Sequence, residues 1–358
     1  MSFRPPNIEA LRQEAREFSD RKFKAGLSGE RFDTRKHQLL QTHPVNRFME
    51  SELATPLPRM LFGSFWFEHE LCILFADTNL GKSVLAVQIA DTLSKAYTVE
   101  PFYNKMDECA TVLYVDFELT AKQFQIRYYD GTFGAHLFSD RFYRSQFNPD
   151  GDNPLFYGEK YDEYVAEALR SAVESTGATV LIIDNITYMC RGTDRSADAV
   201  AFMKMLKALK RRYRLSVLVL AHTPKRGQQT PITVNHLQGS KMLINFADSA
   251  FAIGQSAAGP HVRYIKQIKQ RSSAQQYGAE NVCLVTLQKT DGFLHYRLLK
   301  YDHEYRHLHQ ATAEERLQRN TEVAALHGQG LTNRQIGKQL GIHHTTVARC
   351  LEVSEGIN

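Results

Sequence analysis

A lysine and a serine close a short loop between an apolar run and a helical stretch. Residues 72–83 read CILFADTNLGKS, so the loop ends in Gly81, Lys82 and Ser83. In such a loop the backbone N–H groups surround phosphate oxygens, and the following helix points its positive dipole end at the same anion. The lysine reaches the β and γ phosphates, and the serine hydroxyl ligates Mg²⁺. This P-loop pattern predicts that the chain binds a nucleoside triphosphate together with Mg²⁺.

The sequence on both sides supplies the strand, loop and helix that this motif needs. Ala76 replaces the first glycine of the usual pattern, and its small side chain still fits the turn from strand to loop. After the loop, SVLAVQIADTL carries apolar residues at helical spacing. We expect a continuous set of residues to contact the nucleotide, namely Ala76, Asp77, Thr78, Asn79, Leu80, Gly81, Lys82, Ser83 and Val84.

Polar residues follow three further apolar runs. VLIID ends in Asp184, and an aspartate at the tip of a central strand holds Mg²⁺ and its waters, so Ser83 and Asp184 are the predicted metal residues. LYVDFE places Glu118 just past a strand, where a carboxylate can orient and deprotonate the attacking water; Asp116 is the weaker candidate. VLVLAH ends in His222, which is either a γ-phosphate sensor or a structural residue.

Composition limits the class of protein. The chain has 358 residues, 43% hydrophobic and 23% charged, which suits one large core with small appendages. A net charge of +5 is compatible with an anionic partner but does not require one. The five cysteines lack metal-like spacing, which is typical of a reduced cytosolic protein. With no run of eighteen apolar residues, we expect a cytoplasmic protein without a signal peptide or membrane span.

Short runs rich in Val, Ile and Leu alternate with helical stretches from Pro56 to about Tyr301. This alternation is typical of an α/β fold with a parallel sheet covered by helices. Turn residues at 290–292 predict an antiparallel hairpin, and residues 134–160 an irregular connection. The other predicted strands are 72–76, 110–117, 179–184, 216–222, 249–254 and 262–268.

Four motifs, in this order and spacing, resemble those of the RecA-like ATPases. They are AxxxxGKS, VDFE, VLIID and VLAHT, and they look closest to the RepA-type plasmid replicative helicases and their AAA-labelled relatives. The resemblance covers about residues 56–301 and implies a RecA-like P-loop fold with a central, mostly parallel sheet. It also implies that ATP and Mg²⁺ are the cofactors and that Glu118 is the catalytic glutamate. LQGS at 237–240 is similar to the family's Gly-Ser segment, although an ordinary loop glycine explains it equally well.

A pair of cations after a predicted strand resembles the Lys-x-Arg finger of hexameric RecA-fold helicases. By this resemblance Lys269 and Arg271 reach the γ-phosphate of a neighbouring subunit and stabilise the transferring phosphoryl group. The resemblance implies a homo-oligomer, with a hexamer as the expected state. The alternative is a solvated basic strand end in a lysine-rich stretch.

The C-terminal region carries a second recognisable pattern. Thr332 and Gln335 predict a capping box, and Gly341 a tight turn between two helices. The run LTNRQIGKQLGIHHTTVARCL resembles the helix-turn-helix of recombinases and sigma-type regulators. Its last helix would present polar residues to a duplex groove: His343, His344, Thr345, Thr346 and Arg349. The alternative is a three-helix bundle for protein contacts. One near-neutral copy would bind DNA weakly, and several copies on a ring by avidity.

Two loops and one formal motif complete the candidates. In the RecA-like fold the loops after the Asp184 and His222 strands line a central channel. The candidates there for contact with single-stranded DNA are Arg191, Arg195, Lys225 and Arg226, although exposed loop charges would look the same. Residues 303–307 match HExxH, but the pattern follows a predicted strand and lacks an apolar helix, which favours a polar linker over a zinc site.

We therefore expect four parts: a charged helical segment at 1–47, a RecA-like ATPase domain at 48–301, a linker at 302–311 and a small all-α helix-turn-helix at 312–358. The predicted function is a ring-forming helicase or translocase of plasmid or mobile-element replication or mobilisation. It would bind single-stranded DNA in the ring and duplex DNA at the helix-turn-helix. One alternative is a DNA-binding regulator or recombination accessory that uses ATP as an assembly switch without unwinding. Another is an ATPase acting on proteins.

Overall fold

The structure is a computed structural model of the chain. It describes residues 42–99, 103–146, 148, 161–186, 196–223, 227–237, 241–309, 313–340, 342 and 344–355. The chain divides into two units, Met1–Leu57 and Pro58–Asn358, and each is considered by itself. In the first unit the structure describes helix α2 (Val45–Glu52), which has no buried residues.

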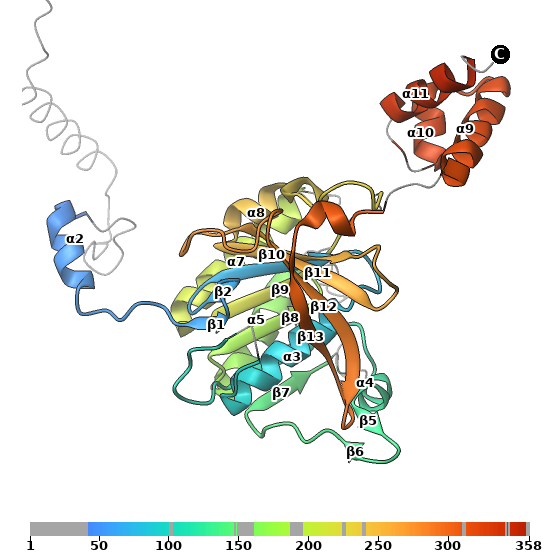
Figure 1. The fold of residues 1–358 in the computed structure, drawn as a ribbon. Coiled ribbons are helices and arrows are strands. Elements are labelled where there is room, and N and C mark those ends of the chain that lie inside the picture. Colours follow the sequence, from blue (N-terminus) through green and yellow to red (C-terminus); the bar gives the residue numbers. More distant parts are fainter. Residues whose placement is uncertain are drawn as a thin grey trace, which may run out of the picture. The chain divides into compact units, whose positions relative to one another are not determined.

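The second unit is built on a large mixed sheet (Figure 1). Within the described residues this sheet has nine strands in the order β13-β12-β11-β10-β3-β9-β8-β4-β7. The strands are β3 (Leu71–Ala76), β4 (Val112–Asp116), β7 (Phe142–Ser145), β8 (Val180–Asp184), β9 (Ser216–His222), β10 (Ser249–Gln255), β11 (Val262–Lys269), β12 (Val282–Thr290) and β13 (Phe293–Asp302).

The sheet has a parallel part and an antiparallel part. The strands from β10 through β3, β9, β8 and β4 to β7 are all parallel to their neighbours. β11, β12 and β13 add to the β10 edge as antiparallel strands, and β12 and β13 form the hairpin that the turn at 290–292 predicts. β9 lies between β3 and β8. This mixed, mostly parallel sheet fits the RecA-like fold expected from the sequence.

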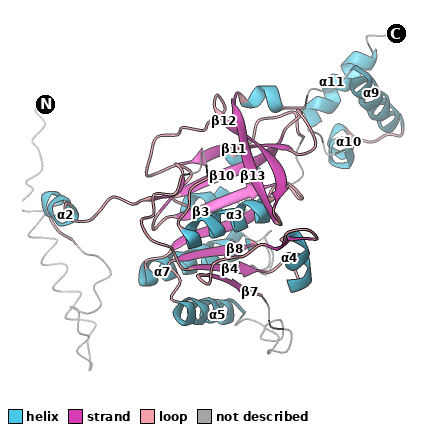
Figure 2. Cartoon of the chain, turned by 60° about the horizontal axis from the view of Figure 1, so that its bottom comes forward, coloured by secondary structure: helices cyan, strands magenta, loops and turns pink. Residues whose placement is uncertain are grey.

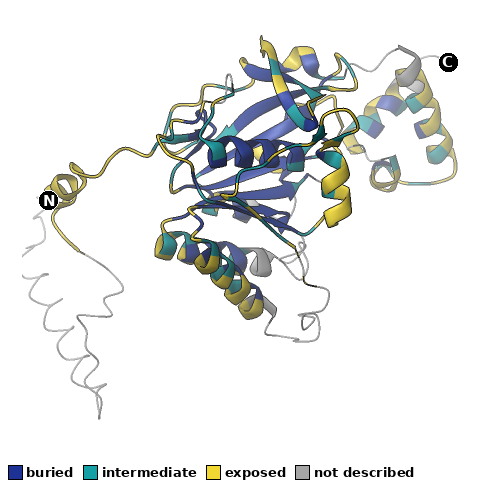
Figure 3. Cartoon of the chain, turned by 90° about the horizontal axis from the view of Figure 1, so that it is seen from below, coloured by how far each residue is buried: buried dark blue, intermediate teal, exposed yellow. Residues whose placement is uncertain are grey.

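Alternate residues of the buried strands face two separate hydrophobic cores. On β3, Leu71, Ile73 and Phe75 belong to the core formed with α5 (Tyr161–Thr176), α7 (Ser196–Tyr213) and α8 (Lys241–Phe246). Cys72, Leu74 and Ala76 belong to the core formed with α3 (Lys82–Lys95). Figure 2 shows α3 crossing the sheet near β3 and β8, and Figure 3 shows the central strands buried. Because both faces are covered, these strands read as continuous apolar runs rather than alternating ones.

Short elements complete this unit. β1 (Met60–Phe62) and β2 (Trp66–Phe67) form a two-stranded sheet, and β5 (Tyr129–Asp130) pairs with β6 (Gly134–Ala135). The remaining elements are α4 (Ala121–Arg127) and the 3₁₀ turns η2 (Val234–His236) and η3 (Glu304–His307).

One connection is more regular than the sequence predicted. The expectation of an irregular segment at 134–160 is wrong for its first part, because β6 lies there and β7 forms the edge strand beside β4. Glycine, aspartate and scattered aromatics predict a loop locally. Pairing with the neighbouring strand β4 overrides that local preference.

Three helices follow at the C-terminal end: α9 (Ala313–Gly328), α10 (Asn333–Leu340) and α11 (His344–Glu355). They pack around Val323, Ile336, Val347 and Cys350 as a small core of their own. The predicted capping box is present: the Thr332 N–H donates to Gln335 Oε1 at 2.9 Å and the Gln335 N–H to Thr332 Oγ1 at 3.4 Å. Gly341 lies outside the described residues, and the use of these helices on DNA stays a prediction.

None of the helices among the described residues combines the length and apolar character needed to cross a membrane.

Candidate nucleotide-binding and hydrolysis site

The P-loop lies at the carboxyl end of β3, between its last residue Ala76 and the start of α3 at Lys82. Gly81 has a φ of +83°, a left-handed conformation that favours glycine. A Cβ at this position would lie 2.1 Å from the hydroxyl oxygen of Tyr296. That hydroxyl donates to the carbonyl of Leu80, so β13 holds the loop from one side. No side chain caps the amino end of α3, and its N–H groups remain available to an anion.

The Lys82 ammonium lies in the middle of the site. It donates to the carbonyls of Ala76 and Asp77, both at 3.1 Å, and lies 3.1 Å from His222 Nδ1. The residue is 5% exposed, and this burial lowers the pKa of Lys82 against the opposing attraction of nearby carboxylates, chiefly Asp184. Phosphate oxygens would supply the counter-charge that a buried ammonium lacks.

Asp184 ends β8 two strands away from the P-loop strand and is fully buried. Its Oδ2 accepts a hydrogen bond of 2.6 Å from the Tyr114 hydroxyl. Its Oδ1 has no hydrogen-bond partner in the part of the chain that the structure describes. Desolvation raises the pKa of Asp184 to about 6, although the Ser83 and Tyr114 hydroxyls act in the opposite direction.

The donor set fits a Mg²⁺ ion. A buried carboxylate oxygen without a partner and a nearby serine hydroxyl are oxygen ligands of the kind that Mg²⁺ prefers, directly or through its waters. When bound, the ion would neutralise charge on the phosphates and stabilise the ionised form of Asp184.

Glu118 lies two residues beyond β4, next to His222. Glu118 Oε1 accepts a hydrogen bond from Asn185 Nδ2 and lies 3.2 Å from His222 Nε2. The His222 ring therefore lies between the Lys82 ammonium and the Glu118 carboxylate, and its Nε2 also lies 3.0 Å from Asn185 Nδ2. The His222 hydrogen bond is the main cause that lowers the pKa of Glu118, so this carboxylate is ionised at neutral pH and can accept a proton from water.

Asp116 has a different role from Glu118. Its Oδ1 accepts the backbone N–H groups of Glu118 and Leu119, at 3.0 and 2.9 Å. Its Oδ2 forms an ion pair of 2.8 Å with Arg144 on β7. Arg144 also donates to the carbonyl of Leu119. Because both Asp116 oxygens are occupied, this residue holds the turn that carries Glu118.

The finger candidates lie at the other end of the sheet. Lys269 donates to the carbonyl of Ile244 at 2.6 Å, and Arg271 pairs with Asp248 at 3.3 Å. Asp248 accepts the N–H of Leu71, the first residue of β3, whereas the P-loop follows the last. Five strand steps of about 3.3 Å separate these ends by roughly 16 Å. Arg271 is therefore not placed at the chain's own phosphate site.

The DNA candidates are only partly visible. Five of these candidates lie outside the described residues, namely Arg191, Arg195, Lys225, Arg226 and His343. Residues 238–240 of the Gly-Ser segment also lie outside them. On α11, His344, Thr345 and Arg349 are exposed and Thr346 is half-buried, whereas Val347 and Cys350 face the small core.

Several residues of the site were not foreseen from the sequence. Tyr114 and Arg144 act from positions inside strands, and Tyr296 comes from a hairpin more than 200 residues after the P-loop. Asn185 had a local signal, because it directly follows Asp184 at the sheet edge. The others become neighbours only through the strand order, which local sequence does not reveal.

The HExxH pattern at 303–307 does not lie on an α-helix. Its last four residues form the 3₁₀ turn η3, and Glu304 is paired with Lys266. Across the described ranges, no group of three or more His, Cys, Asp or Glu side chains could hold a metal ion.

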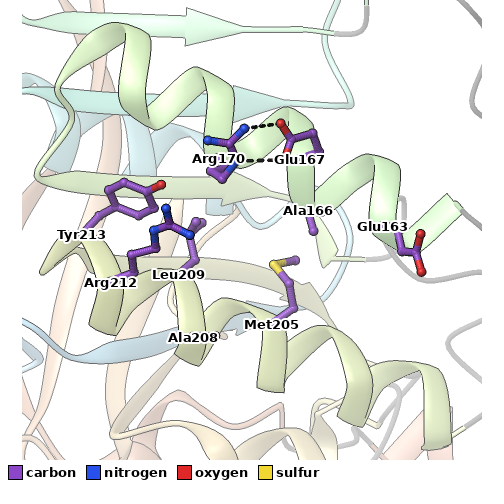
Figure 4. Close-up of a pocket in the computed structure, with 9 residues that line it drawn as sticks. All are labelled: Glu163, Ala166, Glu167, Arg170, Met205, Ala208, Leu209, Arg212 and Tyr213. Atoms are coloured by element: carbon purple, nitrogen blue, oxygen red, sulfur yellow. Dashed lines mark hydrogen bonds and ion pairs between the residues drawn. The ribbon is translucent and has the colours of Figure 1, made fainter. Parts of the chain in front are cut away.

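A groove of about 370 Å³ lies between α5 and α7, and none of the residues that line it belongs to the P-loop (Figure 4). Arg170 forms ion pairs with Glu167 and Glu174, and Tyr213 also donates to Glu174. Because these polar groups pair with one another, we interpret the groove as part of the contact between two helices and not as a ligand site.

Together, the strand order and the residues around Lys82, Asp184 and Glu118 define a P-loop nucleotide-binding protein. Residues 38–228, more than half of the chain, match the family described as AAA domain. The chain belongs to this family, whose membership supports ATPase activity and implies nucleotide binding, typically with Mg²⁺. A search of curated proteins gave no match.

Proposed function

We propose that the protein hydrolyses ATP and acts on DNA as a ring-forming helicase or translocase in plasmid or mobile-element replication or mobilisation. The observation that carries hydrolysis is the meeting of Lys82, Asp184, Glu118 and His222 at one end of the parallel strands. In this proposal Lys82 binds the β and γ phosphates. Ser83 and Asp184 hold Mg²⁺, and Glu118 takes the proton of the attacking water.

The position of the finger residues supports an oligomer as the active form. Lys269 and Arg271 lie near the start of β3, whereas the P-loop follows its end. A role for them in phosphoryl transfer therefore requires the nucleotide site of another copy of the chain. Burial lowers the pKa of Lys269, and the neighbouring Arg271 charge adds to this effect. An anion from a second subunit would relieve this repulsion between cations.

Action on DNA rests on the C-terminal helices and on the resemblance of their sequence. The exposed polar face of α11 is compatible with groove contacts by His344, Thr345 and Arg349. The rival function is a DNA-binding regulator that uses ATP as an assembly switch, and the same helices are compatible with it.

Steady-state ATP hydrolysis distinguishes these functions. The assay compares no DNA, single-stranded DNA and duplex DNA, with Lys82→Ala as the control that removes phosphate binding. Strong stimulation by single strands that is lost in Lys82→Ala supports the motor. Weak turnover that DNA does not change, with sequence-specific duplex binding, would instead support the switch.

Arg349→Ala tests the helix contact in the same assay. If α11 binds duplex DNA, this variant loses affinity for the duplex while hydrolysis without DNA stays at the wild-type rate. Equal duplex affinity in the two proteins would exclude Arg349 from the contact.

A further inference from the structure

A buried ion pair joins three segments that are far apart in the sequence. Lys266 on β11 lies 2.5 Å from Glu304, and their side chains are 10% and 1% exposed. Glu304 also accepts the N–H of Ile232 at 2.8 Å, and Lys266 donates to the carbonyl of Ile232 at 2.8 Å. Both polar groups of the Ile232 backbone are thus held by one ion pair, which we call the Lys266–Glu304 clasp.

One end of the clasp leads back to the nucleotide site. Ile232 lies ten positions after His222, whose ring is between Lys82 and Glu118. Thr223, which directly follows His222, donates its N–H to the carbonyl of Ala76 in the P-loop at 3.1 Å. The buried hydroxyl of Thr223 has no hydrogen-bond partner within the described residues. Thr223 thus contacts the P-loop four positions before segment 227–237, which the clasp holds at Ile232.

The sheet places the clasp close to the P-loop strand. Lys266 is opposite Ala252 on β10, and Ala252 is opposite Phe75 on β3. Two strand spacings separate Lys266 from Phe75, a distance of about 10 Å.

The other end of the clasp leads toward the C-terminal helices. Glu304 begins the turn η3, and the same segment is fixed by a hydrogen bond from the His309 N–H to the Gln228 carbonyl at 3.0 Å. Helix α9 begins at Ala313, four residues after His309. Segment 227–237 and segment 302–309 are therefore bound to each other at two points, immediately before the chain enters α9.

A buried ion pair adds little to the free energy of unfolding, because apolar residues of similar volume often stabilise a fold as well. Its better-attested use is to fix the position and register of the segments that it joins. We propose that the Lys266–Glu304 clasp transmits the nucleotide state from His222 to segment 302–309, and so to the C-terminal helices. Binding at Lys82 shifts segment 227–237, and segment 302–309 follows because Ile232 is held from both sides. This inference rests on the proposed ATP binding.

Amide hydrogen exchange of the full-length protein tests the clasp, with and without Mg²⁺ and a slowly hydrolysed ATP analogue. Binding of a fluorescent analogue is measured separately. In the wild type we expect nucleotide binding to change the amide exchange rates of both segments by about fivefold or more. Fivefold is the lower end of the range typical of coupling between two sites. In Glu304→Gln we expect the change in 227–237 to remain and the change in 302–309 to be lost.

The matched control is Arg306→Gln, which removes an exposed guanidinium that pairs with Asp302 on the same segment and leaves the clasp intact. It should respond like the wild type. Because Glu304→Gln leaves a buried lysine without its partner, the double variant Lys266→Met with Glu304→Leu provides a well-packed second test, and it too should lose the response in 302–309.

Each outcome is decisive. Nucleotide binding without any change in 302–309 of the wild type overturns the inference and leaves the proposed function intact. An unchanged response in Glu304→Gln or in the double variant also overturns it. Absence of nucleotide binding in the separate measurement overturns the proposed function, and the inference falls with it.

Discussion

Replacing Asp184 with asparagine should change how the stability of the protein depends on pH. Burial raises the pKa of Asp184 from 3.8 to about 6. Since one pKa unit corresponds to about 1.4 kcal/mol, ionising this side chain in the folded protein costs about 3 kcal/mol more than in the unfolded chain. The side chain is fully buried, so solvent screening does not reduce this value appreciably.

The sign follows from proton binding. Between about pH 4 and pH 6 the folded protein holds this proton more tightly than the unfolded chain, so the Asp184 contribution to stability falls as pH rises. Asparagine does not titrate and lacks this contribution. The free energy of unfolding of Asp184→Asn, relative to the wild type, should therefore rise by about 2–3 kcal/mol from about pH 4 to about pH 7.5.

The assay is urea unfolding of both proteins without nucleotide and with a metal chelator. The change with pH is the prediction, because the new amide costs about 1–3 kcal/mol at every pH if its N–H groups stay unpaired. Asp107→Asn, which removes a carboxylate that is 89% exposed, should keep the wild-type profile. Identical pH profiles for Asp184→Asn and the wild type would refute the reasoning. The Asp184→Asn variant should also lose Mg²⁺-dependent nucleotide binding.

Three further substitutions test the remaining parts of the site. Glu118→Gln should slow ATP hydrolysis by about 10²–10⁴-fold and leave the nucleotide dissociation constant nearly unchanged; unchanged hydrolysis would exclude Glu118 as the proton acceptor. Gly81→Ala should lower stability by more than about 1–2 kcal/mol in thermal or urea unfolding, because a left-handed residue gains a Cβ that meets Tyr296. Arg144→Met should lower stability by up to about 3 kcal/mol, less than for a fully buried pair because Arg144 is 17% exposed, and should reduce kcat more than it raises KM. A change in KM alone would contradict the positioning of Glu118 by Arg144 and Asp116.

The sequence by itself was enough for the P-loop and the main strands. Gly81, Lys82 and Ser83 are neighbours in the chain, and their chemistry depends on a local turn from strand to helix. Buried parallel strands read as unbroken apolar runs, so β3, β8 and β9 were visible, and so were the acids and the histidine that follow such runs. The preference for Glu118 over Asp116 as proton acceptor also came from the sequence, although it stays a prediction until hydrolysis is measured.

The tertiary structure alone decided which distant groups support these residues. Tyr114 touches Asp184, Arg144 holds Asp116, and Tyr296 holds the P-loop only because the strand order brings their strands together. The edge strand β7 was missed for the same reason, since its residues lack a strong local preference and pair with β4 across the sheet. Local pattern fixes the residues that act on phosphate, because a turn suffices to form their site. The partners that orient and desolvate those residues depend on long-range pairing, which no local pattern encodes.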